Sequence, residues 1–152
     1  MSRAGYGDDE DFPGQHGLYR GAVRRAIRGK RGQAFLRELA DALDAMPLKE
    51  LVARTVVRQG ECCALGAVAL RRGVDLAPIT YDDPEDEEID GDWTTEWLRD
   101  ELGIVDCLAR EVVYENDDCG AWNETPADRW RRIRAWVASQ LRDAAPAAGG
   151  AS

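Results

Sequence analysis

Residues 18–46 read LYRGAVRRAIRGKRGQAFLRELADALDAM, and the fold of the chain is decided here. Over residues 18–27, apolar side chains recur at the spacing that places them on one face of an α-helix. Over residues 35–46, a second apolar stripe follows with the same spacing. Gly29 and Gly32 lie between the two segments and indicate a break. The stretch therefore predicts two antiparallel helices joined by a short turn.

The rest of the chain continues in short segments that are mostly helical. Residues 52–58 alternate between apolar and basic side chains, which is typical of a half-buried strand, and residues 62–65 can return as its partner. A helix is the alternative for this region. Helical spacing and helix-end signals predict four further helical segments, at residues 64–72, 94–102, 104–113 and 126–141. The expected fold class is mainly α: a single-domain helical bundle of about five helices, with one small β-hairpin (α+β) if the alternating segment forms strands.

Two of these segments carry more specific predictions. Residues 104–113 are apolar on two faces, so this segment is expected to be the central buried helix. Gly66 weakens the helix propensity of its segment, and close packing against another backbone is the expected reason.

The length of 152 residues and the 44% of hydrophobic residues are typical of one globular domain. We expect a flexible acidic arm over residues 1–16 and a single helical domain over residues 17–143. Within that domain, residues 78–92 hold a dense run of acids and are expected to form a mobile acidic loop. Residues 144–152 are expected to be a disordered tail.

Composition also argues against several classes of protein. The sequence contains no run of 18 apolar residues, and its first residues carry acids where a signal peptide needs an apolar stretch. We therefore expect no membrane partner and a cytoplasmic location. The net charge of −9 disfavours generic binding to the phosphates of nucleic acid.

The net charge conceals a strong segregation of charge along the chain. Residues 12–37 hold seven bases and no acid, residues 82–92 hold eight acids and no base, and residues 129–134 hold four bases. The molecule is therefore expected to have ends of opposite charge, and a partner could be attracted to either one.

The acidic segment and the tryptophans that follow it are the first candidate for a partner-binding site. Acids spaced along a surface can imitate phosphates, and two tryptophans four residues apart can anchor a partner. The alternative is a solvated loop whose tryptophans tether it to the core. The residues expected to contact a host or phage protein are Asp82, Asp83, Glu85, Asp86, Glu87, Glu88, Trp93 and Trp97.

The basic segment is the second candidate, as a surface for nucleic acid. Contacts to phosphates would be made by Arg24, Arg25, Arg28, Lys30 and Arg31. The alternative is a solvated face whose cations pair with acids of the same molecule. Tyr19 is the only aromatic residue interleaved with these cations, so the segment offers no platform on which nucleic-acid bases could stack.

No catalytic, cofactor or metal site is predicted. The nucleophile elbow G-x-S-x-G and the phosphate loop G-x-x-x-x-G-K-[ST] are both absent. The sole histidine, His16, lies in the expected arm, which disfavours a cysteine–histidine pair. The cysteines lack the spacing of zinc ligands and are expected to be small buried hydrophobic residues in a reducing compartment. They are Cys62, Cys63, Cys107 and Cys119.

Residues 115–120 hold one further cluster of potential ligands. The carboxylates of Glu115, Asp117 and Asp118, beside Asn116, could hold a divalent cation. The calcium-loop pattern is not met, and Asn and Asp in a turn between helices usually hydrogen-bond their own backbone. We therefore expect a structural turn.

Short motifs add a resemblance to these observations. They are Cys-Ala-Leu-Gly-Ala at 63–67, Asn-Asp at 116–117 and Thr-Pro at 125–126. In this pattern, residues 18–142 resemble a family of small uncharacterised proteins from phages, prophages and actinobacteria, and residues 28–36 look like the N-terminal part of the phage members. The chain departs from the family in Cys62 and in the acidic insertion at 82–92. The family has no assigned activity, so the resemblance implies a phage-like context and a shared fold.

The function expected first is that of a non-enzymatic, phage-type interaction protein that binds a host or phage macromolecule through segregated charged surfaces. One alternative is a nucleic-acid-binding protein that uses the basic N-terminal helix. Another is a zinc-stabilised or metal-dependent enzyme that uses the cysteines. The sequence leaves the identity of the partner and the oligomeric state open.

Overall fold

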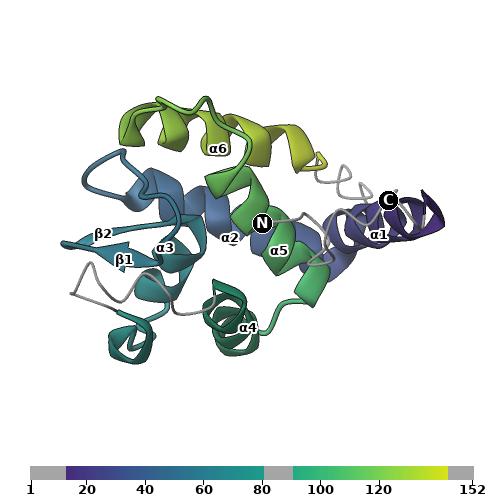
Figure 1. Ribbon diagram of the computed structural model, residues 1–152, viewed down its shortest axis with the longest axis horizontal. Helices are drawn as coiled ribbons and strands as arrows, with labels where there is room; N and C mark the ends of the chain where they lie inside the picture. The colour runs from purple at the N-terminus through teal and green to yellow at the C-terminus, as the bar shows by residue number, and fades with distance from the viewer. Residues whose placement is uncertain (1–12, 81–90, 144–152) are drawn as a thin grey trace, which may run out of the picture.

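The computed structural model describes residues 13–80 and 91–143 (Figure 1). In these residues the chain forms six α-helices and one two-stranded antiparallel sheet. The expected fold class, mainly α with one small β-hairpin, is confirmed. The elements are α1 (Pro13–Arg28), α2 (Lys30–Ala45), β1 (Val57–Arg58), β2 (Glu61–Cys62), α3 (Ala64–Arg71), the 3-10 turn η1 (Ala77–Ile79), α4 (Gly91–Leu102), α5 (Asp106–Asp117) and α6 (Pro126–Gln140).

The first two helices form where the sequence predicts them, but they are connected differently. α1 ends at Arg28 and α2 begins at Lys30, so Gly29 alone separates two helices of 16 residues each. Figure 1 shows α1 at the right end of the molecule and α2 leading away from it toward the opposite end. The predicted antiparallel pair is therefore wrong, because a single extended residue turns the chain without reversing it.

Several boundaries also differ from the predicted ones. Residues 13–16, expected in the arm, belong to α1. The expected loop at 78–92 begins inside η1, whose Ile79 is buried, and ends where α4 begins at Gly91. Thr95, expected near the start of its helix, is buried within α4. The other parts of the expected arm, loop and tail lie outside the described residues, at 1–12, 81–90 and 144–152.

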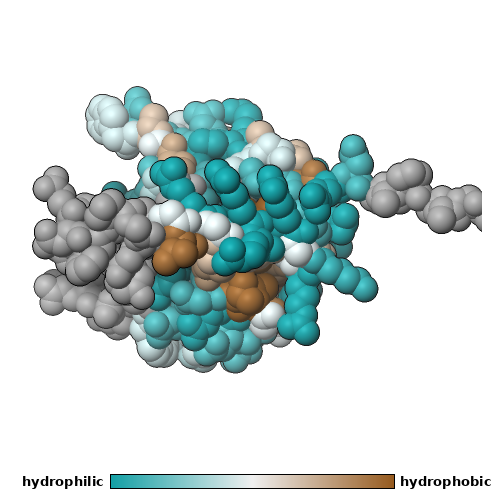
Figure 2. Space-filling model, turned by 90° about the vertical axis from the view of Figure 1, so that its right-hand side faces the viewer, coloured by the Kyte–Doolittle hydropathy of each residue, from teal (hydrophilic) through white to brown (hydrophobic). Residues whose placement is uncertain are grey.

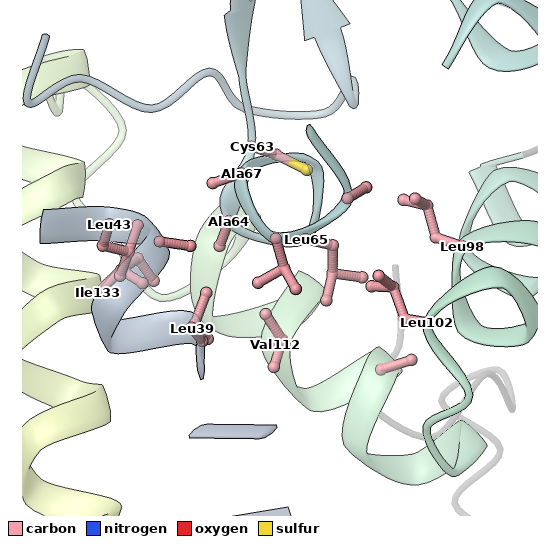
Figure 3. Packing of buried hydrophobic residues seen from close by; sticks show 14 of the residues in the cluster. Leu39, Leu43, Cys63, Ala64, Leu65, Ala67, Leu98, Leu102, Val112 and Ile133 are labelled. Atoms are coloured by element: carbon pink, nitrogen blue, oxygen red, sulfur yellow. The ribbon is translucent and has the colours of Figure 1, made fainter. Parts of the chain in front are cut away.

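The hydrophobic core is centred on α2 and α3. Leu36, Leu39 and Leu43 lie on one face of α2 and are fully buried, and residues 64–69 of α3 are buried as well. Burying one leucine side chain contributes about 2 kcal/mol of stability. Figure 3 shows Leu39 and Leu43 of α2 and Ile133 of α6 on one side of α3, Leu98 and Leu102 of α4 on the other, and Val112 of α5 below it.

α5 is largely buried, as its sequence predicts: Leu108 and Val112 are buried, and only Val105, at its N-terminal cap, is 53% exposed. α5 shares the centre of the core with α3, whose small residues allow neighbouring backbone to approach closely. A Cβ atom at Gly66 would lie 2.9 Å from the carbonyl oxygen of Val56. The close packing predicted for this glycine is thereby confirmed.

The β-hairpin forms, with strands shorter than predicted. β1 and β2 are joined by Gln59 and Gly60, whose φ angles of 51° and 84° suit a two-residue hairpin turn. The strand expected over residues 52–58 is interrupted at Arg54, because its φ of 61° is not an extended conformation. The return strand ends at β2, since α3 begins at Ala64.

Candidate functional site

The cations of α1 and of the first turn of α2 form one exposed surface, which we call the basic face. Val23 and Ile27 are each 7% exposed and hold α1 against the core. Helical geometry then turns the residues between them toward solvent. The basic face consists of the exposed side chains of Arg20, Arg24, Arg25, Arg28, Lys30 and Arg31. The five cations predicted for nucleic acid therefore lie together, and Arg20 extends their row.

The junction between the two helices makes this surface continuous. Gly29 is extended, with φ −67° and ψ 160°. A Cβ atom at Gly32 would lie 1.7 Å from the carbonyl oxygen of Ala26, so no side chain fits between the helices at this point. Glycine thus lets the first turn of α2 pack directly on the last turn of α1. Lys30 and Arg31 follow the cations of α1 without an intervening loop.

The basic face differs from the later helices in its lack of carboxylate partners. With the side chains described at residues 17–80 and 93–143, none of its six cations forms an ion pair. Arginines later in the chain do contact carboxylates, namely Arg72, Arg99, Arg110, Arg129, Arg131, Arg132 and Arg134. The alternative of cations paired with acids of the same molecule is therefore not met among the described residues.

Figure 2 views the end of the molecule where α1 lies. Long hydrophilic side chains gather there in a broad band, and hydrophobic areas of smaller extent lie beside it. Leu18 of α1 is 75% exposed and Val105 before α5 is 53% exposed. This face is thus mainly hydrophilic, with separate apolar side chains among the hydrophilic ones rather than one continuous apolar patch.

The acidic site predicted from the sequence is only partly described. Trp93, in α4, is 44% exposed and accessible to a partner. Trp97 is half-buried and packs against the hydrophobic core, as in the alternative in which a tryptophan tethers the acidic segment. The structure therefore does not present the two tryptophans as a pair of exposed anchors. The acids predicted to accompany them lie outside the described residues: Asp82, Asp83, Glu85, Asp86, Glu87 and Glu88.

The cysteines differ widely in their environments. Cys62 and Cys63 are buried, and burial raises their pKa to about 11 and about 12. Both thiols are therefore protonated at neutral pH and are poor nucleophiles. Cys107 is half-buried and Cys119 is exposed, so the prediction of a buried hydrophobic residue is wrong for Cys119. Among the described residues, no group of three or more His, Cys, Asp or Glu side chains is arranged to hold a metal ion.

Asn116 and Asp117 end α5 and connect it to distant backbone. Asn116 is 2% exposed; its Oδ1 accepts the N–H of Ala64 at 3.1 Å, and its Nδ2 donates to the carbonyl oxygen of Val52 at 2.8 Å. Oδ1 of Asp117 accepts the N–H of Arg54 at 2.9 Å. The sequence predicts that these side chains hydrogen-bond the backbone of their own turn. This prediction is wrong, because the end of α5 lies against residues 52–64 and the side chains bond to the backbone there. Their oxygens stabilise the fold.

A second polar cluster, which the sequence does not single out, braces the turn before α6. The Glu124 side chain is 7% exposed, and its carboxylate contacts Arg132 at 2.6 Å and Arg129 at 3.3 Å. These contacts lower the pKa of Glu124. A backbone hydrogen bond from Glu124 closes the turn that carries Trp122, which is 98% exposed. The four arginines at 129–134 indicate that a carboxylate partner is needed, but the sequence does not show that Glu124, in the turn before α6, is that partner.

Comparison with protein-family models, with curated proteins and with solved structures finds no match for this chain. The resemblance to small phage and actinobacterial proteins therefore stays a prediction based on short motifs. In the part of the chain that the structure describes, no helix has both the length and the apolar character needed to span a membrane.

Proposed function

We propose that this protein is a non-enzymatic interaction protein that binds nucleic acid through the basic face. The observation that carries the proposal is that six exposed cations stand together without an ion pair to another described residue. Phosphates attract such a surface because each contact releases a condensed counterion from the nucleic acid. The phage or host origin of the nucleic acid rests on the resemblance, and a cytoplasmic location belongs to the same proposal.

The position of Lys30 and Arg31 supports a role other than folding. Both lie in the first turn of α2, where the helix dipole is positive and where the helix has no acidic residue. Cations in the first turn of a helix gain no stability from the dipole of their own helix. Lys30 and Arg31 also have no carboxylate partner among the described residues, which suits a surface that binds an anion from outside.

The non-enzymatic part of the proposal rests on the thiols. Cys62 and Cys63 are buried, and the raised pKa of each keeps it protonated at neutral pH. A thiol in this form is a poor nucleophile. The two residues instead complete the core beside α3.

The proposal is tested by fluorescence anisotropy of labelled nucleic acid titrated with the full chain. We expect affinity that falls steeply with salt and that is weakened by the triple substitution Arg24→Gln, Arg25→Gln and Arg28→Gln, because these side chains contact phosphates. The matched control is Arg58→Gln, Arg71→Gln and Arg131→Gln, which removes the same charge from exposed positions elsewhere. No binding by the wild type at low salt, or equal weakening by both triples, would contradict the proposal.

The acidic surface remains a second proposal, favoured by the 44% exposure of Trp93. In this version, a host or phage protein docks on Trp93 and on the neighbouring acids. Pull-down of such a protein with the wild type is expected to be lost in Trp93→Ser and when the acids at 82–88 are replaced by Asn and Gln. Recovery that both variants leave unchanged would argue against this surface.

A further inference from the structure

We infer that the basic face binds a nucleic-acid duplex by its phosphate backbone, without stacking on bases and without selecting a base sequence. This inference rests on the proposed function and specifies the class of nucleic acid. Three observations support it. The amide and aromatic side chains near the six cations are buried or half-buried in the fold. The helix that carries most of the cations is fixed on the core.

Recognition of adenine by hydrogen bonds would need amide side chains among the cations, because Asn and Gln pair with its edge in the major groove. Contacts to phosphates need no amide, since Arg and Lys side chains are sufficient for them. Gln33 is the only amide residue in residues 17–45. It is buried, and its Nε2 donates to the carbonyl oxygens of Ile27 at 2.8 Å and Gln140 at 2.9 Å. Its Oε1 accepts the N–H of Arg142 at 2.7 Å, so the side chain is engaged on both ends inside the fold.

Binding of a single strand would need aromatic side chains on which its bases could stack. Tyr19 of α1 is half-buried and packs against the core, and Phe35 of α2 is 3% exposed. The exposed tryptophans of the described residues belong to other elements, Trp93 to α4 and Trp122 to the turn before α6. A duplex keeps its bases stacked internally, so a surface that offers only cations suits a duplex better than a single strand.

The spacing of the cations also suits a rigid ligand. Arg20, Arg24 and Arg28 follow one another at four-residue intervals on α1, so the helical rise separates their backbones by about 6 Å each. B-DNA carries one negative charge per roughly 1.7 Å of axis, so several phosphates fall within reach of such a row. Because Val23 and Ile27 fix α1 on the core, the backbone that carries the row is already ordered before binding.

The experiment compares four labelled probes by anisotropy: two duplexes of unrelated sequence and one separated strand of each. Titrations of the full chain at several salt concentrations give the slope of log affinity against log salt. We expect the two duplexes to bind equally and each separated strand to bind more weakly. In the double variant Arg24→Gln/Arg28→Gln, the slope for duplex is expected to become shallower by about 1.8, since each lost phosphate contact removes about 0.9. The control double variant Arg58→Gln/Arg71→Gln keeps the wild-type slope.

The remaining outcomes overturn different parts of the argument. If the separated strands bind as tightly as the duplexes, the preference for a duplex is refuted, but the proposed function is not. A preference for one duplex refutes binding to the backbone alone. Displacement of the duplex by polyglutamate at equal charge concentration indicates an acidic protein as the ligand and refutes both statements. Absence of binding to all four probes at low salt also refutes the proposed function.

Discussion

The side chain of Asn116 holds the first turn of α3 in place, with its Oδ1 accepting the backbone N–H of Ala64 at 3.1 Å across 52 residues of sequence. Its Nδ2 donates to the carbonyl oxygen of Val52 at the same time. One buried amide therefore joins α5, α3 and the segment that leads into the hairpin. The position of the central helix depends on a residue at the end of another helix.

The substitution Asn116→Ala should lower the free energy of unfolding by about 2–4 kcal/mol, because it leaves a buried N–H and a buried carbonyl without partners. Urea denaturation measures the change. Asn123→Ala, in the exposed turn before α6, is the matched control and should change stability by less than about 0.5 kcal/mol. Equal effects of the two substitutions would show that the Asn116 bonds do not stabilise the fold.

The junction of α1 and α2 provides a second prediction. Gly32→Ala should destabilise the protein by about 3 kcal/mol or more, because the added Cβ would lie 1.7 Å from the carbonyl oxygen of Ala26. Gly21→Ala, within α1, should instead raise stability by about 0.5–1 kcal/mol, since its Cβ would meet only the Arg25 side chain at 3.6 Å. Thermal unfolding of the two variants measures both effects, and a Gly32→Ala protein as stable as the wild type would mean that the helices do not approach so closely.

The cluster around Glu124 predicts a loss of stability in acid. Arg132 and Arg129 lower the pKa of this carboxyl below its usual 4.5, so its contribution to stability is complete above pH 4.5 and is lost as the pH falls through the lowered value. Glu124→Gln should lower the stability at pH 7 by about 2 kcal/mol. It should also flatten the decline of stability below pH 4.5, because the substituted side chain binds no proton.

Urea denaturation at several pH values tests this prediction, with Glu101→Gln on the exposed side of α4 as the control. The control should follow the wild-type dependence on pH closely. If the stability of Glu124→Gln falls with pH in parallel with that of the wild type, the ion pairs of Glu124 with Arg132 and Arg129 do not cause the loss of stability in acid.

The buried thiols predict the opposite behaviour in alkali. Burial raises the pKa of Cys62 to about 11 and that of Cys63 to about 12, from an unfolded value of 9.0. Their contribution to stability is therefore complete below pH 9 and is lost as the pH rises from 9 through these values. Cys62→Ala should lose less stability between pH 8 and about pH 10 than the wild type does.

Thiol labelling at pH 8 gives a second measurement on the same residues. Cys119 is exposed and should react first, whereas Cys62 and Cys63 should react only when urea unfolds the protein. Labelling sites are identified by peptide mass. Rapid modification of Cys63 in the folded protein would contradict its burial and the protonated state assigned to it.

Much of the secondary structure follows from local spacing. The apolar stripe of α2 places Leu36, Leu39 and Leu43 on one face. This face is buried in the core whichever other helices pack against it. The Thr125 hydroxyl accepts the N–H of Asp128 at 3.1 Å, as expected for a helix that begins at Pro126. The six cations of the basic face are likewise placed by helical periodicity once Val23 and Ile27 point into the core.

Contacts between distant parts of the chain decided the features that local spacing does not encode. The exposure of Val105, the central place of α3 and the bonds of Asn116 all depend on which helices meet, and side-chain volume and backbone approach settle that choice. Pairing of charges is decided in the same way: the arginines of α6 find carboxylates that the fold brings near, whereas those of α1 find none among the described residues. A list of charges along a chain therefore shows where cations lie, and only packing in three dimensions shows which of them stay available for a ligand.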